Sequence, residues 1–140
     1  MIETAVPLTL TLAIGLGAIL LAAGIGGFSA TAGPVSDWAE AIEEMDRMPG
    51  LTLALAFVAI LFGGGILLVH HHWSDPLAAI VTLIAWASFA EGLLLLGMPR
   101  LYLSFARLAV RYTRPWAAVA TVLGLALLIA GLTGRATSTL

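Results

Sequence analysis

Two places in this chain carry side chains that could bind or transfer something: Glu91, and the segment VHHHWSDP at residues 69–76. Glu91 lies inside a long apolar run, where a carboxylate is costly and usually serves an ion path, a proton relay or a polar contact between helices. Its expected partners are the hydroxyl of Thr121, at a similar depth in the last apolar run, or the guanidinium of Arg100 or Arg107. Glu91 is therefore predicted either to couple proton or cation movement or to hold two helices together.

The histidine segment is a second candidate site. In extended backbone alternate side chains share one side, so His70 and His72 are expected to converge, with Asp75 close by. Two imidazoles and a carboxylate suit zinc or another divalent ion, and the cluster His70–His72 would also suit haem. The spacing matches no specific metal signature, however, and no cofactor is required. The alternative is a polar turn that Trp73 anchors at a membrane surface.

The sequence lacks the residue patterns of common enzyme classes. It contains no cysteine, which excludes disulfides, zinc–thiolate centres and iron–sulfur clusters. It has neither a glycine-rich phosphate-binding loop nor a nucleophile placed beside a general base. The arginines are too few, and too close to apolar segments, to indicate nucleic-acid binding. These absences favour a non-enzymatic protein.

The composition predicts a membrane protein. Of the 140 residues, 61% are hydrophobic and only 10% are charged, whereas soluble domains carry about 25% charged residues. Four apolar runs, each near the ~20 residues that span a bilayer as a helix, cover residues 5–28, 51–69, 77–98 and 115–132. The chain is therefore expected to be one all-α membrane domain, residues 1–140, built as a four-transmembrane-helix bundle with two short interfacial helices at 36–47 and 100–113.

The arginines predict the orientation of these spans. All the cationic residues are arginine, and every one except Arg135 lies in the first or third connector. Connectors rich in Lys and Arg face the cytoplasm. Both termini and the histidine segment are then expected on the periplasmic or exterior side.

The two expected interfacial helices carry opposite charge. The first holds five acids against Arg47, and the second carries a stripe formed by Arg100, Arg107, Arg111 and Arg114. Opposite charge predicts that the two helices attract one another; the alternative is that the arginine stripe binds anionic lipid headgroups. The order span, interfacial helix, span occurs twice, so any internal repeat would be parallel rather than inverted.

Small residues four apart recur in all four spans and include Gly17, Gly63, Gly92 and Gly124. Lipid is as apolar as leucine, so helices in a membrane associate mainly through close backbone approach at such residues. The cluster Gly63–Gly65 predicts close packing or a local bend in the second span. Small faces left over would serve a homo-oligomer or a larger membrane complex.

A turn of the form His-x-x-Trp joins the second and third spans, and the pattern continues through His70, Trp73, Thr82, Leu83, Trp86, Gly92 and Pro99. With this pattern, residues 48–99 resemble a group of small uncharacterised bacterial four-helix membrane proteins. Three positions depart from the group: His71 stands for Asn, Ala85 for Gly, and Glu91 for Lys, which inverts a charge. The resemblance implies a bacterial inner-membrane location and no established activity.

Two functions of different classes follow. The first is a structural or accessory membrane subunit that binds partners, which the packing faces and charged connectors favour. The second is a small proton- or cation-coupled transporter or channel that uses Glu91. Four-helix multidrug exporters of similar size carry their membrane carboxylate in the first span, whereas the first span here has none. A metal- or haem-binding protein that uses His70–His72 is the third.

Overall fold

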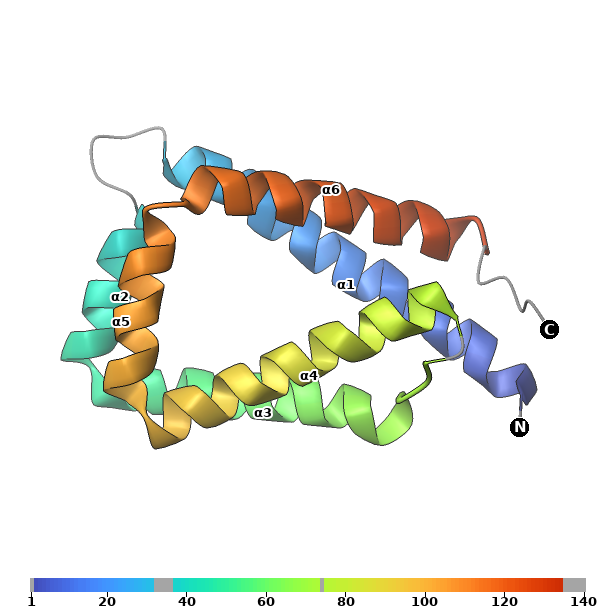
Figure 1. The fold of residues 1–140 in the computed structure, drawn as a ribbon, viewed down its shortest axis with the longest axis horizontal. Helices are drawn as coiled ribbons and strands as arrows, with labels where there is room; N and C mark the ends of the chain where they lie inside the picture. The colour runs from blue at the N-terminus through green and yellow to red at the C-terminus, as the bar shows by residue number, and fades with distance from the viewer. Residues whose placement is uncertain (1, 32–36, 74, 135–140) are drawn as a thin grey trace.

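The computed structural model describes residues 2–31, 37–73 and 75–134, which form helices and no strand (Figure 1). Four helices are long and apolar enough to cross a membrane, and two are short. In chain order they are α1 (Ile2–Ala30), α2 (Asp37–Arg47), α3 (Pro49–Val69), α4 (Pro76–Gly97), α5 (Pro99–Val110) and α6 (Thr113–Leu132). The expected all-α class, with four spans and two short helices, is confirmed.

Proline and aspartate set several helix boundaries. Pro49, Pro76 and Pro99 each open a helix, where the missing N–H leaves no hydrogen bond unmade. The Asp75 carboxylate caps α4. The last span begins at Thr113, two residues before the expected start, because proline is tolerated throughout the first turn. Residue 36, the expected start of the first short helix, lies outside the described residues.

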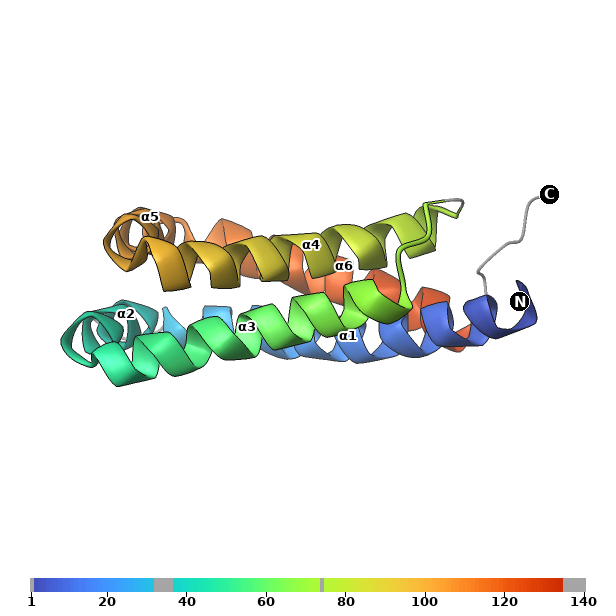
Figure 2. The same ribbon diagram turned by 90° about the horizontal axis from the view of Figure 1, so that it is seen from below.

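The four long helices form two pairs, α1 with α6 and α3 with α4. The pairs meet at one end, called here the narrow end, and diverge toward the wide end, where α2 and α5 lie side by side (Figure 1). From the perpendicular direction α4 lies over α3 and α5 over α2 (Figure 2). The buried core lies toward the narrow end and draws on all four spans, with Ala13, Leu16, Ile66, Leu77, Val81, Ala85 and Leu127.

Glycine lets the backbones of α3 and α4 touch. A Cβ atom added at Gly63 would lie 2.5 Å from both the carbonyl oxygen of Ala85 and the amide nitrogen of Phe89. Gly64 faces the Phe89 ring at 3.4 Å, whereas nothing lies near Gly65. The glycine cluster therefore serves close packing at two of its three positions, and α3 continues through it as one helix.

The α1–α6 pair is built in the same way. A Cβ atom at Gly24 would lie 2.8 Å from the carbonyl oxygen of Ala117 and 2.7 Å from the nitrogen of Thr121. One added at Gly124 would lie 2.8 Å from the carbonyl oxygen of Gly17. Backbone contact at small residues, as the sequence predicts, thus holds both pairs together.

The two pairs correspond residue by residue. A Cβ atom added at Gly92 of α4 would lie 2.8 Å from the carbonyl oxygen of Ala56 and 2.7 Å from the nitrogen of Ile60, both on α3. These are the distances found for Gly24 against α6. The corresponding positions keep a constant separation along each helix: Gly17 and Ala85, Gly24 and Gly92, Ala56 and Ala117, Ile60 and Thr121, Gly63 and Gly124. The segment α1–α2–α3 therefore matches α4–α5–α6 as an approximate two-fold repeat, parallel as the order of elements indicates.

The glycine contacts yield a matched test of packing. Gly63→Ala is expected to force α3 and α4 apart and to lower the free energy of unfolding by about 1–3 kcal/mol, the usual cost of overpacking. Gly65→Ala, two residues away, meets open space and should leave stability unchanged or raise it. Thermal unfolding of both variants in detergent measures the difference; equal losses would show that these contacts do not hold the pair.

Candidate functional site

His70 lies at the narrow end and joins three helices. It follows α3 directly and its side chain is fully buried. Its Nε2 atom lies 2.8 Å from the hydroxyl of Thr9 on α1, and its Nδ1 atom lies 3.3 Å from the hydroxyl of Thr82 on α4. The imidazole therefore connects one helix pair to the other through two threonines.

The surroundings of His70 favour its neutral form. The Thr82 hydroxyl donates its one hydrogen to the carbonyl oxygen of His72, at 3.1 Å, so it is free to accept from the Nδ1–H of His70. Burial lowers the pKa of His70, and the neighbouring rings of His72 and His71 lower it further. A buried, neutral histidine that is hydrogen-bonded at both ring nitrogens is a structural connector between the two pairs.

The neighbouring histidines are exposed and lie against one another. The rings of His70 and His72 are 5.4 Å apart, edge to face, which agrees with their expected convergence. Alternation along an extended backbone would point His71 away from His72, but its ring stacks on that of His72 at 5.6 Å. The Asp75 carboxylate accepts from the backbone nitrogens of Leu77 and Ala78, so it serves the α4 N-terminus.

This geometry bears on the predicted metal site. Among residues 2–31, 37–73 and 75–134, no three His, Asp or Glu side chains gather in a way that could hold a metal ion. Both ring nitrogens of His70 are within hydrogen-bond distance of threonine hydroxyls, which leaves no free lone pair aimed at solvent. Metal or haem binding by this segment therefore gains no support from the arrangement. Arg135 lies outside the described residues.

Glu91 is placed differently from the prediction. It is exposed on the surface of α4, and the hydroxyl of Tyr102 on α5 donates a hydrogen bond to its carboxylate. Burial raises the pKa of Tyr102 above its ordinary value, and the Glu91 carboxylate raises it further. The expected partner Thr121 instead donates to the Ala117 carbonyl oxygen of its own helix and packs against Gly24.

Neither of the two expected arginine partners pairs with Glu91. Among the described residues the ion pairs involve Arg107 alone, and Arg100 forms none. A count of residues along a helix does not show which way a side chain faces, so it could not reveal that Thr121 and Glu91 have different neighbours. Tyr102 could have been suggested by one signal: Pro99 turns the chain, so the first turn of α5 returns toward the last turns of α4.

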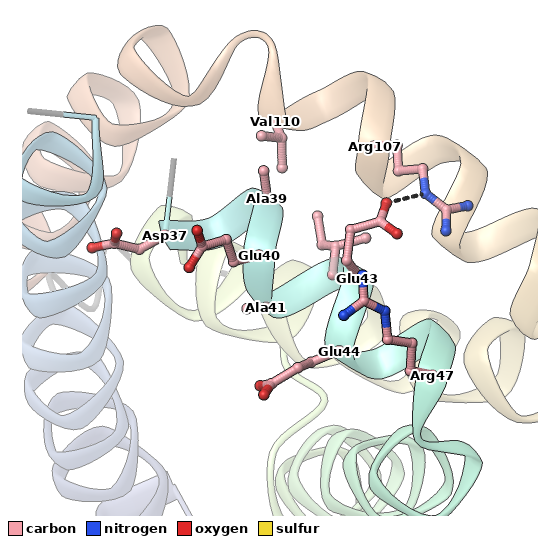
Figure 3. A pocket seen from close by; sticks show the side chains of 10 residues that line it. Asp37, Ala39, Glu40, Ala41, Glu43, Glu44, Arg47, Arg107 and Val110 are labelled. Atoms are coloured by element: carbon pink, nitrogen blue, oxygen red, sulfur yellow. Dashed lines mark hydrogen bonds and ion pairs between the residues drawn. The ribbon is translucent and has the colours of Figure 1, made fainter. Parts of the chain in front are cut away.

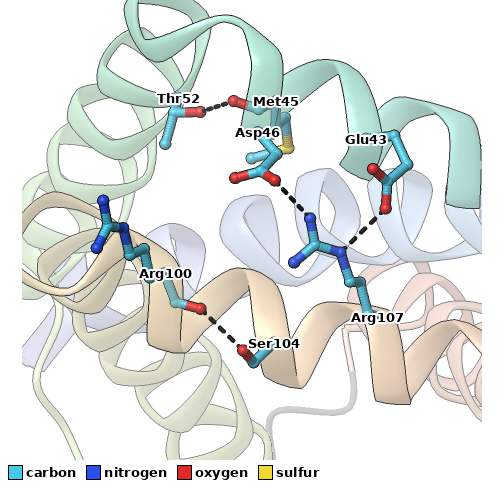
Figure 4. A network of polar contacts seen from close by, with 7 residues as sticks. All are labelled: Glu43, Met45, Asp46, Thr52, Arg100, Ser104 and Arg107. Carbon is cyan, nitrogen blue, oxygen red and sulfur yellow. Dashed lines mark hydrogen bonds and ion pairs between the residues drawn. The ribbon is translucent and has the colours of Figure 1, made fainter.

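Arg107 joins the two short helices at the wide end. Its Nε atom lies 3.0 Å from the Glu43 carboxylate and a terminal nitrogen lies 2.7 Å from that of Asp46 (Figure 4). These two acids raise the pKa of Arg107, although the group is exposed. The predicted attraction between the acidic and the basic helix is therefore confirmed, and one arginine carries it.

The remaining charges of α2 and α5 stay available. An open pocket of about 600 Å³ lies along α2 and reaches α5 at Arg107 and Val110 (Figure 3). Its charged lining consists of Asp37, Glu40, Glu43, Glu44, Arg47 and Arg107. Three further arginines are exposed: Arg100 on α5, Arg111 directly after it and Arg114 at the start of α6. Of these, Arg114 lies 3.4 Å from the Thr31 hydroxyl.

Comparison with family models, curated proteins and solved structures finds no match to this chain. Three arrangements therefore bear on its function: the buried His70, the Glu91–Tyr102 pair, and the Arg107 ion pairs. The first and third are contacts that hold helices together, and the threonine hydroxyls beside the His70 ring are buried with it.

The burial of His70 predicts a pH effect on stability. A histidine whose folded-state pKa is lowered stabilises the fold fully above its unfolded pKa, and that stability is lost as the pH falls below about 6.5. The wild-type melting temperature should therefore drop between pH 7.5 and 5. His70→Gln should melt lower at pH 7.5 and lose most of this pH dependence, whereas the exposed His71→Gln should behave like wild type. A pH profile unchanged by His70→Gln would contradict the role assigned to the imidazole.

Proposed function

We propose that this chain is a multi-pass protein of the bacterial inner membrane that works as a non-enzymatic accessory subunit and binds its partners through the charged wide end. The observation that carries the proposal is the Arg107 ion pair with Glu43 and Asp46, which fixes α2 against α5 outside the spans. The pair turns two amphipathic helices into one platform with acids on one helix and arginines on the other.

The rest of the platform supports a binding role. Asp37, Glu40 and Glu44 line an open pocket and make no ion pair among the described residues. Arg100, Arg111 and Arg114 likewise remain exposed and suit anionic groups of a lipid surface or a partner. Charges of this kind steer association and set specificity more than they stabilise a fold.

A native-membrane experiment tests the accessory role. Blue-native electrophoresis of chemically crosslinked membranes, with the chain expressed at its natural level, should show it in a complex well above its own 14.5 kDa. Arg107→Glu should release much of it, and the second change Glu43→Arg should restore part of the complex by exchanging the charges. A wild-type chain that migrates alone would contradict the proposal.

The proposal includes an orientation. With α2 and α5 at the cytoplasmic face, as the positive-inside rule favours, both chain ends lie on the periplasmic side. A reporter that is active only in the periplasm should be active when fused after Leu140 and inactive when fused after Arg111. A reporter that fluoresces only in the cytosol should give the reverse pattern. Cytosolic fluorescence from the fusion at Leu140 would overturn this orientation.

A small proton- or cation-coupled transporter is the second candidate, and one observation favours it. Glu91 is a carboxylate within a span that is exposed and hydrogen-bonded to Tyr102 rather than sealed in a core. Proteoliposomes of the purified chain should show no proton or cation flux above empty vesicles if the accessory role holds. Flux that Glu91→Gln abolishes would support the transporter and defeat the accessory role.

A further inference from the structure

Glu91 lies on the face of α4 that turns toward α6. Leu77, Ile84 and Glu91 follow one another at seven-residue spacing, which places them on one stripe of the helix. At the narrow end Leu77 and Ile80 line a small pocket of about 260 Å³ together with residues of α6. Glu91 therefore continues, toward the wide end, the same stripe that lines this pocket together with α6 at the narrow end.

The opposing stripe of α6 is apolar. Trp116, Leu123 and Ala130 repeat at seven-residue spacing, and the last two line the same small pocket. Because the pairs diverge (Figure 1), the stripes separate toward the wide end, where Trp116 is 62% exposed and Val119 55% exposed. These stripes form what is called here the α4–α6 face, with Ile84, Ala87 and Glu91 on one side and Trp116, Val119 and Leu123 on the other.

No cation pairs with Glu91 among the described residues. It lies six residues before the end of α4, which places it about 9 Å inside the span at 1.5 Å per residue. Its hydrogen-bond donor there is the neutral hydroxyl of Tyr102, and no ion pair reaches it within the described part of the chain. Carboxylates at such depth generally pair with an opposite charge.

The internal repeat provides a comparison within the same molecule. On the opposite side of the molecule, the face between α1 and α3 has Ala23 at the position equivalent to Glu91, and Val58 at that equivalent to Val119. Val58 is 62% exposed and is suited to lipid alone. Of the two equivalent faces, only the α4–α6 face carries a charge in the described residues, and lipid chains give no reason for it.

We propose that the α4–α6 face binds a transmembrane helix of a partner protein, and that this helix carries a lysine or arginine level with Glu91. The inference deepens the accessory function and rests on it. A helix is the occupant proposed because the two stripes run along the length of the spans, whereas the small pocket between them at the narrow end does not include Glu91. The small side chains of Ala87 and Ala126 allow the close approach on which helix association in lipid depends.

A synthetic helix tests the proposal without knowledge of the natural partner. The probe is a transmembrane peptide of about 22 leucine and alanine residues with a single arginine about 9 Å from its inner end. The control peptide has leucine in place of that arginine. Energy transfer between the labelled full-length chain and each peptide in neutral lipid vesicles should show at least about tenfold tighter binding of the arginine peptide.

Variants then locate the binding face. Glu91→Gln should abolish the preference for arginine, while its circular dichroism stays that of the wild type. Val119→Trp should weaken binding of the arginine peptide, whereas the matched Val58→Trp on the α1–α3 face should not. Equal binding of the two peptides, a preference that survives Glu91→Gln, or equal effects of the two tryptophans would each overturn the proposal. So would a Glu91-dependent dimer of the chain without peptide, because a second copy would then be the occupant.

Failure of this inference and failure of the accessory function give different results. If native membranes contain the chain in a larger complex but the arginine peptide shows no preference, the accessory function stands and the α4–α6 face is not its helix-binding site. If the peptide binds through Glu91 but the native chain migrates alone, the binding face stands and the accessory function is lost.

Discussion

Backbone contact at small residues is the constraint on which this fold depends. In lipid, leucine gains little by packing against leucine, so helices adhere where glycine and alanine allow their backbones to meet. The chain places such residues where they make two tight pairs, at Gly63 and Gly92 between α3 and α4, and at Gly24 and Gly124 between α1 and α6. Other interactions must therefore hold the two pairs against each other.

Two polar connections of different kinds add to this packing, one between the two pairs and one between the two short helices. At the narrow end His70 is buried between threonines of α1 and α4, where a neutral ring satisfies both hydroxyls without placing a charge in the core. At the wide end Arg107 pairs with two acids in an exposed position, where ions screen the attraction. We therefore expect pH to act on the contact at the narrow end and salt to act on the ion pairs at the wide end.

Much of the fold could be predicted from the sequence, and the reason is physical. Lipid requires long apolar helices, so length and composition alone locate the four spans, and the amphipathic charges of α2 and α5 place these helices outside them. The attraction between α2 and α5 followed from their opposite signs. The angle between the pairs could not be predicted, because it depends on which face each glycine presents.

The candidate sites were harder to predict because depth along a helix does not fix direction around it. Counting residues places Glu91 and Thr121 at a similar depth, but Thr121 faces α1 and Glu91 meets Tyr102. His70 was identified as a polar residue at a helix end, but its partner Thr9 is far away in sequence and nothing local indicates it. Contacts between distant segments require the packing of the spans, which a single sequence does not specify.

The internal repeat shows where the molecule departs from its own symmetry. At the position equivalent to His70, α6 has Gly131, which packs against Ile14 of α1 much as His70 meets Thr82 of α4. At the position equivalent to Glu91, α1 has Ala23. The packing glycines are kept in both halves because both need close backbone contact. The histidine and the glutamate appear in one half each, so helix pairing, which both halves share, does not require them. Their chemistry is therefore what distinguishes one face and one end of the molecule from the other.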